Sequence, residues 1–211
     1  MVEQRPRDER DLWNREYSRG THASREPDPF LLNAYRDFVD PIYPQSGRAL
    51  DLAGGTGRHA VWLAERGWRV TVVDVSEVAM AQLKRNAESR GLDVESVLAD
   101  LSTPAGRKQL DKHRYDMILV FFYLERKLFP ALMRALKPGG VLIYKTYTVE
   151  QLRFAGGPRH PLHLLRPNEL LRVFRGLRVL HYRETVRDKG VAEFVGWKEA
   201  VGRIAGESNK R

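Results

Sequence analysis

The sequence predicts a doubly wound α/β domain with a mostly parallel, seven-stranded sheet that ends in an antiparallel hairpin. Short apolar segments alternate with amphipathic helical segments between residues 48 and 146, as they do where helices cover both faces of a parallel sheet. A glycine-rich turn at residues 54–57 joins the first strand of this series to a helix. Two more strand-like segments lie between residues 177 and 197, and the turn-like sequence between them predicts the hairpin.

Residues 1–40 are expected to form a helical lid or decoration outside the sheet. Apolar residues recur at helical spacing in two segments, which predicts helices over 9–19 and 29–39. The polar residues 20–28 between them predict a loop. Pro41, and Pro44 after it, end the second helix because proline cannot continue it.

The main domain is expected to span residues 41–200, and the polar residues 201–211 are expected to form a frayed tail. Apolar runs predict its strands, which are 48–53, 69–73, 94–98, 115–120, 141–146, 177–184 and 190–197. Amphipathic runs predict its helices, which are 57–66, 77–90, a short turn at 104–111, 125–136 and 167–174. The sequence Lys-Pro-Gly-Gly at 137–140 is expected to stop a helix and turn the chain.

Length and composition exclude several classes of protein. The chain has 211 residues, the length of one domain, and contains no cysteine. Disulfides, zinc sites with Cys ligands and methyl transfer through a Cys nucleophile are therefore excluded. No apolar run is long enough to predict a membrane span, and the charged N-terminal segment lacks the apolar region of a secretory signal. We therefore expect a cytoplasmic protein without a membrane partner; no feature predicts its oligomeric state.

The chain is basic, with 36 Lys and Arg residues, 27 Asp and Glu residues and a formal net charge of +9. A positive charge of this size is compatible with a nucleic acid or another anionic partner. The arginines are spread along the chain, however, and no basic tail with interleaved aromatic residues is present. We therefore expect a small-molecule partner, with RNA as the alternative.

The segment 49–57, Ala-Leu-Asp-Leu-Ala-Gly-Gly-Thr-Gly, is typical of a nucleoside site. Its glycines let the backbone turn sharply and let a ligand approach without a Cβ in the way, and the following helix presents unpaired N–H groups. Asp74 ends the next strand, where a carboxylate can accept both hydroxyls of a ribose. Gly55, Gly57 and Ala60 also fit the pattern of a dinucleotide site, so the glycines alone leave both cofactor classes open.

Asp51 discriminates between these two cofactor classes. It lies four residues before Gly55, inside the strand and close to the glycine loop. A carboxylate there would repel a pyrophosphate, but it would attract the cationic amino-acid end of S-adenosylmethionine, directly or through the loop backbone and water. We therefore expect S-adenosylmethionine as the cofactor and S-adenosylhomocysteine as its product.

Residues 51–57 resemble motif I of the class I S-adenosylmethionine-dependent methyltransferases, which is usually written D-x-G-x-G-x-G or D-L-A-C-G-T-G. Ala53 stands at the first Gly of that motif and Gly54 stands where Cys is common, and both are small. The resemblance covers roughly residues 12–195 and implies the Rossmann-like methyltransferase fold, which contains a terminal hairpin. Three segments resemble the tellurite-resistance-like branch of the family: 13–17, 27–31 and 58–76.

One set of residues is expected to contact the cofactor. Arg58 can pair with the methionine carboxylate, and Val75 is expected near the adenine. The resemblance implies that Asp100 accepts the adenine amino group and that the backbone of Leu101 supports the ring, with turn capping as the alternative for Asp100. Tyr17 is expected to belong to a lid. The full set is Asp51, Ala53, Gly54, Gly55, Gly57, Arg58, Asp74, Val75, Asp100, Leu101, Phe121 and Tyr17.

The acceptor side is marked by less specific residues. Residues 121–124, Phe-Phe-Tyr-Leu, end the fourth strand and lack the N/D-P-P-Y/F motif of enzymes that methylate amino groups of adenine or glutamine. The candidate catalytic residues are Tyr123, Tyr147, His160 and His163, and a structural or surface role is the alternative for each. No pair of histidines has the i,i+4 spacing of a helical metal site, so no metal is expected.

The sequence therefore predicts a methyltransferase that acts on a small molecule, such as an oxyanion, a thiol or a phenol. The sulfonium already activates the methyl group, so alignment of the acceptor and exclusion of water can suffice. This agrees with the lack of an evident catalytic base. Three alternatives remain, which are an RNA methyltransferase, a nucleotide-dependent oxidoreductase and a cofactor-binding scaffold without catalysis.

Overall fold

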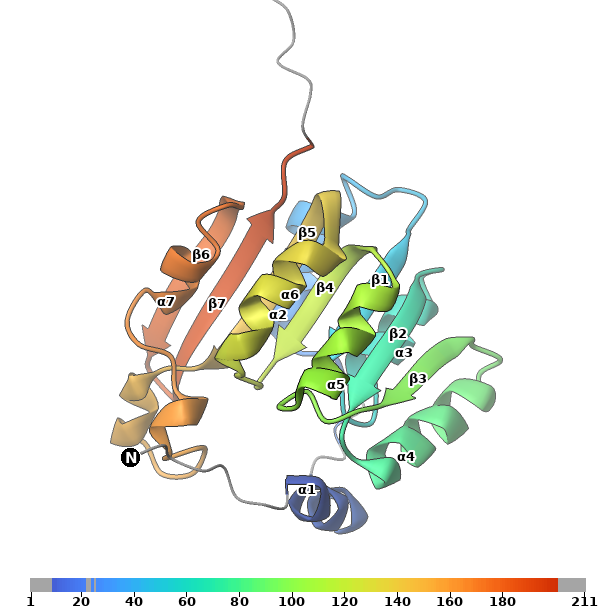
Figure 1. Ribbon diagram of the computed structural model, residues 1–211, viewed down its shortest axis with the longest axis horizontal. Coiled ribbons are helices and arrows are strands. Elements are labelled where there is room, and N and C mark those ends of the chain that lie inside the picture. The colour runs from blue at the N-terminus through green and yellow to red at the C-terminus, as the bar shows by residue number, and fades with distance from the viewer. Residues whose placement is uncertain (1–8, 22–23, 25, 201–211) are drawn as a thin grey trace, which may run out of the picture.

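The computed structural model describes residues 9–21, 24 and 26–200, and the described strands form one seven-stranded sheet (Figure 1). The predicted tail at 201–211 lies outside the described residues. The strands are β1 (Arg48–Leu52), β2 (Arg69–Asp74), β3 (Val94–Leu98), β4 (Tyr115–Phe121), β5 (Leu136–Tyr147), β6 (Arg178–Val186) and β7 (Gly190–Trp197). They lie in the order β3-β2-β1-β4-β5-β7-β6, and β7 is antiparallel to both of its neighbours. The predicted fold class is confirmed.

Helices cover both faces of the sheet, with α5, α6 and α7 in front and α2 and α3 behind (Figure 1). The α-helices are α1 (Glu9–Ser18), α2 (Pro29–Ala34), α3 (Arg58–Ala64), α4 (Glu77–Glu88), α5 (Pro104–Arg107), α6 (Phe129–Ala135) and α7 (Glu169–Val173). A π-helical turn, η1 (Tyr35–Val39), follows α2, and the 3-10 turns are η2 (Lys108–Lys112), η3 (Arg126–Leu128), η4 (Val149–Arg153) and η5 (Pro161–His163). Of the helices that the structure describes, none is both apolar enough and long enough for a bilayer crossing.

The central strands bury side chains on both faces, which explains why their sequences are continuous apolar runs. Successive side chains of a strand point to opposite faces. In β4, Ile118 and Val120 therefore pack in the core beneath α5, α6 and α7. Met117 and Leu119 pack in the other core, beneath α2, α3 and α4. All four side chains are fully buried.

The helix expected at 125–136 is shorter in the structure. Residues 126–128 form the 3-10 turn η3, and α6 begins at Phe129 with Pro130 in its first turn. Proline is favoured there because the first N–H groups of a helix have no intrahelical partner. β5 begins at Leu136, and its register against β4 shifts between Tyr115 and Met117, so the expected turn at 137–140 is an irregular part of the strand.

The strand order reverses between β1 and β4, and this reversal positions the site. In open α/β sheets, ligands bind outside the carboxyl ends of the strands at such a point. α1 and the segment that contains η4 and η5 lie below this edge of the sheet in Figure 1. The carboxyl ends of the parallel strands therefore face two segments, which are α1 and the loop that contains η4 and η5.

Candidate functional site

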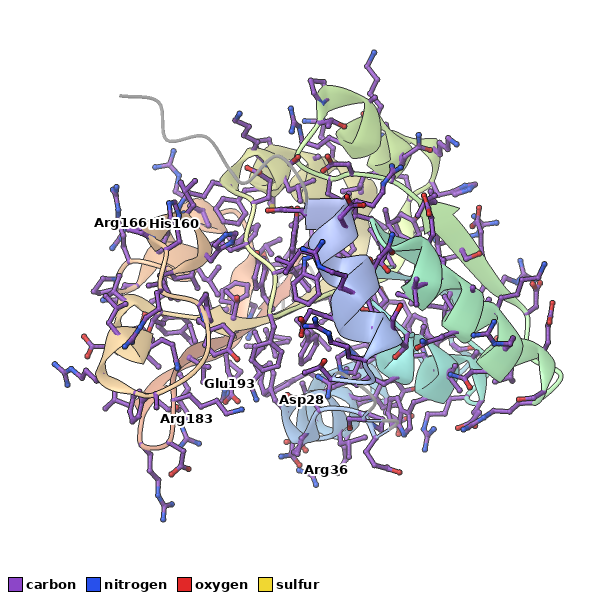
Figure 2. All side chains as sticks on the ribbon, turned by 90° about the horizontal axis from the view of Figure 1, so that it is seen from below. Asp28, Arg36, His160, Arg166, Arg183 and Glu193 are labelled. Carbon is purple, nitrogen blue, oxygen red and sulfur yellow. The ribbon has the colours of Figure 1, made fainter. Side chains whose placement is uncertain are left out.

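A cavity of about 660 Å³ lies at the carboxyl ends of β1, β2, β4 and β5, within the range typical of ligand pockets. All of the predicted cofactor residues except Gly57 line it. Of the candidate catalytic residues, Tyr123, Tyr147 and His163 line it and His160 does not. Figure 2 shows His160 beside Arg166 on the loop away from α1. The structure thus brings residues of both predicted groups, apart from Gly57 and His160, to the walls of one cavity.

Gly57 has a role in the fold of the glycine loop. It precedes α3 with a φ of 80°, a conformation that L side chains rarely adopt. A Cβ at this position would also collide with the side chain of Leu83 in α4. Gly57 therefore allows α3 to pack closely on α4, and its backbone N–H donates to the carbonyl of Gly54 over 3.0 Å.

The glycine loop bends through left-handed backbone conformations. Gly55 has a φ of 55°, and Ala53, which stands at a glycine of motif I, has a φ of 54°. A left-handed conformation at a residue with a Cβ costs about 1–2 kcal/mol. The bond from the N–H of Ala53 to the carbonyl of Val73, 2.7 Å long, helps to hold it there. Such strain is typical of functional sites, where the surrounding structure fixes it.

Asp51 is buried beneath this loop, with 1% of its surface exposed. Its Oδ2 atom has no hydrogen-bond partner among the residues that the structure describes. A Cβ on Gly54 would lie 2.8 Å from this carboxyl group, so glycine is needed for the two to approach. A buried carboxylate oxygen without a partner is costly. The position is therefore suited to a ligand that supplies a donor or a positive charge.

His59, which the sequence analysis missed, lies between Asp51 and Asp28. Its Nε2 accepts the backbone N–H of Asp28 over 3.3 Å, so Nε2 carries no proton and the ring proton is on Nδ1. Nδ1 lies 3.9 Å from Oδ1 of Asp51, too far for a hydrogen bond. The ring also packs on Phe121, with 4.3 Å between centroids. His59 thus connects the glycine loop to the start of α2.

Asp74 is held by the backbone on both of its oxygens. Oδ2 accepts the N–H of Gly55 and Oδ1 accepts the N–H of Ser76, both over 2.9 Å. A carboxylate offers about four lone pairs, so the group can accept a further hydrogen bond from a ligand. Burial raises the pKa of Asp74, while hydrogen bonds from the backbone of Ser76, Gly55 and Val75 oppose that rise. The N-cap of α4 is Ser76, whose hydroxyl accepts from Ala79.

Asp100 caps the turn after β3. Its Oδ1 accepts from the backbone N–H of Ser102 over 2.9 Å and from the hydroxyl of the same residue over 2.6 Å. These two bonds use one carboxylate oxygen and leave Oδ2 for a ligand. Because Asp100 also lines the cavity beside Leu101, turn capping is compatible with ligand binding.

Helix α1 covers the glycine loop and is fastened to α4. The side-chain carbonyl of Asn14 accepts from the hydroxyl of Ser76 over 2.7 Å, and Gln82 donates to the carbonyl of Tyr17 over 3.3 Å. Trp13 and Tyr17 line the cavity, with their rings 5.8 Å apart. Burial, together with the nearby charges of Asp74 and Asp51, raises the pKa of Tyr17, so its hydroxyl keeps its proton.

Gly55→Ala is expected to loosen α1. A Cβ on Gly55 would collide with the hydroxyl of Tyr17, so this ring must leave the loop. We expect faster hydrogen–deuterium exchange over residues 9–18 in this variant. Gly91→Ala is the matched control, because Gly91 also has a positive φ but has open space where the Cβ would be. Equal exchange of α1 in the two variants would contradict the contact.

The wall opposite the glycine loop is aromatic. It includes Phe122, Tyr123 and Tyr147, and the rings of Phe122 and Tyr147 lie 5.2 Å apart. Lys189, from the turn between β6 and β7, also lines the cavity, with its Nζ 5.7 Å from the centroid of Phe122. The sequence analysis placed residues 121–124 on the acceptor side without singling out Phe122. It missed Lys189, because no motif marks this residue and its position in a hairpin turn was the only signal.

Arg126 fixes the loop that carries His163. It forms two hydrogen bonds with the buried carboxylate of Glu169, of 2.7 and 2.9 Å. It also donates to the backbone carbonyls of Leu162 and Leu164. Burial works to raise the pKa of Glu169, but bonds from Arg126 and the backbone of Arg166 outweigh burial and lower it. The carboxylate is therefore charged near neutral pH, and the loop is tied to α7.

Residues 49–140 match the methyltransferase domain family. The tRNA 5-carboxymethoxyuridine methyltransferase of Escherichia coli (strain K12) is 32% identical in an alignment of 123 positions that covers 52% of this chain and 43% of that protein. The probable S-adenosyl-L-methionine-dependent methyltransferase TehB of Haemophilus influenzae is 29% identical in an alignment of 93 positions that covers 43% of this chain and 31% of that protein. The chain thus spans less than half of the length of these two curated relatives.

A solved structure shares the fold. The crystal structure of TehB from Haemophilus influenzae superposes with a TM-score of 0.69 at 17% identity, and the match covers 87% of this chain and 66% of that one. At 17% sequence identity, this superposition shows a shared fold and nothing about activity. It extends well beyond residues 49–140 and therefore includes elements on both sides of the matched domain.

Proposed function

We propose that this chain is a class I S-adenosylmethionine-dependent methyltransferase that resembles the TehB-like branch of that family, and that it transfers a methyl group from S-adenosylmethionine to a small molecule in the cavity. The observation that carries the proposal is the buried Oδ2 of Asp51, which has no partner among the described residues. The cationic amino group of the cofactor, acting directly or through the loop backbone and water, would satisfy this oxygen.

The residues around the cavity fit the rest of the cofactor. The carboxylate of Asp74 faces the cavity and can accept hydrogen bonds from the ribose hydroxyls in addition to those from the backbone. Val75 and Leu101 offer apolar contact for the adenine, and Oδ2 of Asp100 can accept its amino group. Arg58 lines the same part of the cavity, where its guanidinium would pair with the methionine carboxylate.

When bound, S-adenosylmethionine supplies an activated methyl carbon, which forms a bond to the acceptor atom while its bond to sulfur breaks and S-adenosylhomocysteine remains. The chain's own residues orient the acceptor and exclude water. Tyr17 and Trp13 cover the glycine loop, and Tyr123 and Tyr147 close the opposite wall. Burial raises the pKa of Tyr147, so this hydroxyl acts as a hydrogen-bond donor near neutral pH and not as a base.

The two covering segments favour a small acceptor. α1 lines the cavity on one side, and residues 157, 158 and 163 of the loop after β5 line it on another. We propose that residues 1–40 act as a lid on a domain that spans 41–200. A lid of this kind admits a small molecule between α1 and the loop and shields the reaction from water.

RNA is a second candidate acceptor, and the distribution of charge is the observation that favours it. Residues 151–189 contain nine Lys and Arg residues but three Asp and Glu residues. Most of these arginines are exposed, and the segment contributes lining residues to the cavity. A basic surface beside a site attracts nucleic acid through its phosphates.

Calorimetry and a labelling screen test the proposal. We expect the purified chain to bind S-adenosylhomocysteine at one site and not to bind NAD or NADP. We also expect radiolabelled methyl to be transferred to a small acceptor in a panel of oxyanions, thiols, phenols and total RNA. Failure to bind S-adenosylhomocysteine would refute the cofactor assignment, and binding of a nicotinamide dinucleotide instead would favour an oxidoreductase. Labelling of RNA alone would refute the small acceptor.

A further inference from the structure

The acceptor half of the cavity has an aromatic wall whose position is fixed by the backbone. Phe122 has a φ of 56°, although it carries a bulky side chain. Its N–H donates to the carbonyl of Lys145 in β5 over 2.7 Å, and its ring packs against Tyr147. A non-glycine residue keeps a positive φ only where its surroundings hold the backbone in that conformation, and such residues are common at ligand sites. Phe122 is therefore held in place before any ligand binds.

The two lysines near Phe122 differ in their availability. Lys145 is nearly buried and lies 2.9 Å from Asp28 and 3.1 Å from Glu193, so its charge is already neutralised. Lys189 is exposed and lines the cavity, and it forms no ion pair with any residue that the structure describes. Lys189 is thus a cation at the rim of the aromatic wall that can take an anionic ligand group.

The carboxylates that line the cavity lie elsewhere. They belong to the glycine-loop half and to α1, and are Glu9, Asp51, Asp74 and Asp100. Arg58 also lines that half, but its proposed partner is the carboxylate of the cofactor. An anionic acceptor is therefore repelled from that half and attracted to the rim at Lys189. The cavity is polarised, with acidic groups around the proposed cofactor and a cation beside the aromatic wall.

We propose that the acceptor is a planar aromatic molecule with an anionic substituent, such as a carboxylate. Its ring lies against Phe122 and Tyr147, and its anionic group lies at Nζ of Lys189. A ring hydroxyl or thiol then reacts: its oxygen or sulfur bonds to the methyl carbon, the carbon–sulfur bond of the cofactor breaks, and the proton of the hydroxyl or thiol leaves to solvent. A mononuclear oxyanion would leave the aromatic wall unused. This inference rests on the proposed function.

The first test is a comparison of matched acceptors. The probes are pairs of phenols and thiophenols that differ in one group, such as 4-hydroxybenzoate and 4-hydroxybenzamide, with tellurite and total RNA alongside. We expect labelling of aromatic anions, with kcat/KM about five- to tenfold higher than for the neutral partner of each pair. The inference is overturned if no aromatic anion is labelled, or if neutral partners react as well as the anions.

The second test concerns Lys189. We expect Lys189→Met to raise KM about five- to tenfold for the anionic acceptors and to leave the neutral ones unchanged, while Lys189→Arg restores the anionic ones. Arg187→Met is the matched control, because Arg187 is exposed on the same turn and does not line the cavity. An equal loss on both classes of acceptor would overturn the inference.

Calorimetry with S-adenosylhomocysteine distinguishes a failure of the proposed function from a failure of the proposed aromatic acceptor. Lys189 is at the acceptor rim, so the affinity for this product is expected to be the same in the wild type and in Lys189→Met. If the wild type does not bind it, the proposed function fails. If the wild type binds it and the acceptor tests fail, the cofactor assignment survives and the aromatic acceptor is refuted.

Discussion

Asp74→Ala is expected to weaken the binding of S-adenosylhomocysteine by more than tenfold. The proposed bonds from the two ribose hydroxyls go to a charged group, and each such bond contributes about 1.5–3 kcal/mol. The substitution also removes the partner of the N–H groups of Gly55 and Ser76. The loop would then lose its hold on the cofactor and one of its own anchors, so a drop in thermal stability is expected as well. Calorimetry and thermal unfolding measure the two effects.

Two comparisons make this test specific. Asp74→Asn keeps the size of the side chain but replaces one acceptor oxygen with a donor, so we expect an intermediate affinity. Asp188→Ala removes an exposed carboxylate from a turn outside the cavity lining and is expected to change neither quantity. Unchanged affinity in a folded Asp74→Ala protein would remove this residue from the site.

Acidification provides a further check on Asp74. Burial raises the pKa of Asp74 despite the backbone hydrogen bonds that oppose it. A raised pKa means that the group gains a proton at a higher pH than an ordinary aspartate does. The protonated group accepts fewer hydrogen bonds. The affinity of the wild type should therefore begin to fall, as the pH is lowered, before an ordinary aspartate would be protonated.

The sheet could be predicted because its signals are local. Each strand is a short apolar run, and the glycines of the segment 54–57 mark where β1 ends. The start of α6 was misplaced, although Pro130 indicated it, because the residues before it also fit a helical pattern. Boundaries of this kind depend on which backbone hydrogen bonds form. The same sequence can form a 3-10 turn, such as η3, or the first turn of an α-helix.

The glycine-loop half of the cavity could also be predicted from local sequence, because Asp51, Asp74 and the glycines lie at strand ends within one βαβ unit. The acceptor half could be predicted only in part, through Tyr123, Tyr147 and His163. Lys189 and Phe122 are 67 residues apart in sequence, and only the pairing of β5 with β7 brings their elements together. The contact of His59 with Asp28 is likewise invisible to periodicity, because it depends on how α2 packs against α3.

Lys145→Met is expected to lower the free energy of unfolding by about 3–5 kcal/mol, the cost typical of removing one partner from a buried ion pair. The ammonium group of Lys145 lies between the carboxylates of Asp28 and Glu193. The side chain of Lys145 is 14% exposed, and those of Asp28 and Glu193 are 9% and 15% exposed. Figure 2 labels both of these carboxylates. Methionine fills a similar volume but leaves two buried negative charges without a counter-ion. Urea unfolding measures the change.

Two variants show whether charge is the cause. Lys145→Met combined with Asp28→Asn and Glu193→Gln is expected to recover most of the lost stability, because no unpaired charge remains. Lys137→Met is a control for a more exposed pair: Lys137 lies 2.8 Å from Asp116 and is 38% exposed, so a loss of about 1 kcal/mol or less is expected. Equal losses at the two lysines would contradict a special cost at Lys145.

The effect of Lys145→Met should extend to the cofactor half of the cavity. Oδ1 of Asp28 binds Lys145 and also accepts the N–H of Phe30, which caps α2. The backbone N–H of Asp28 donates to His59, which faces Asp51. Without Lys145, the start of α2 loses a fixed point, and so does the segment that leads back to α1. We therefore expect faster hydrogen–deuterium exchange over residues 26–34 and weaker binding of S-adenosylhomocysteine, and unchanged exchange there would show that Asp28 is held without Lys145.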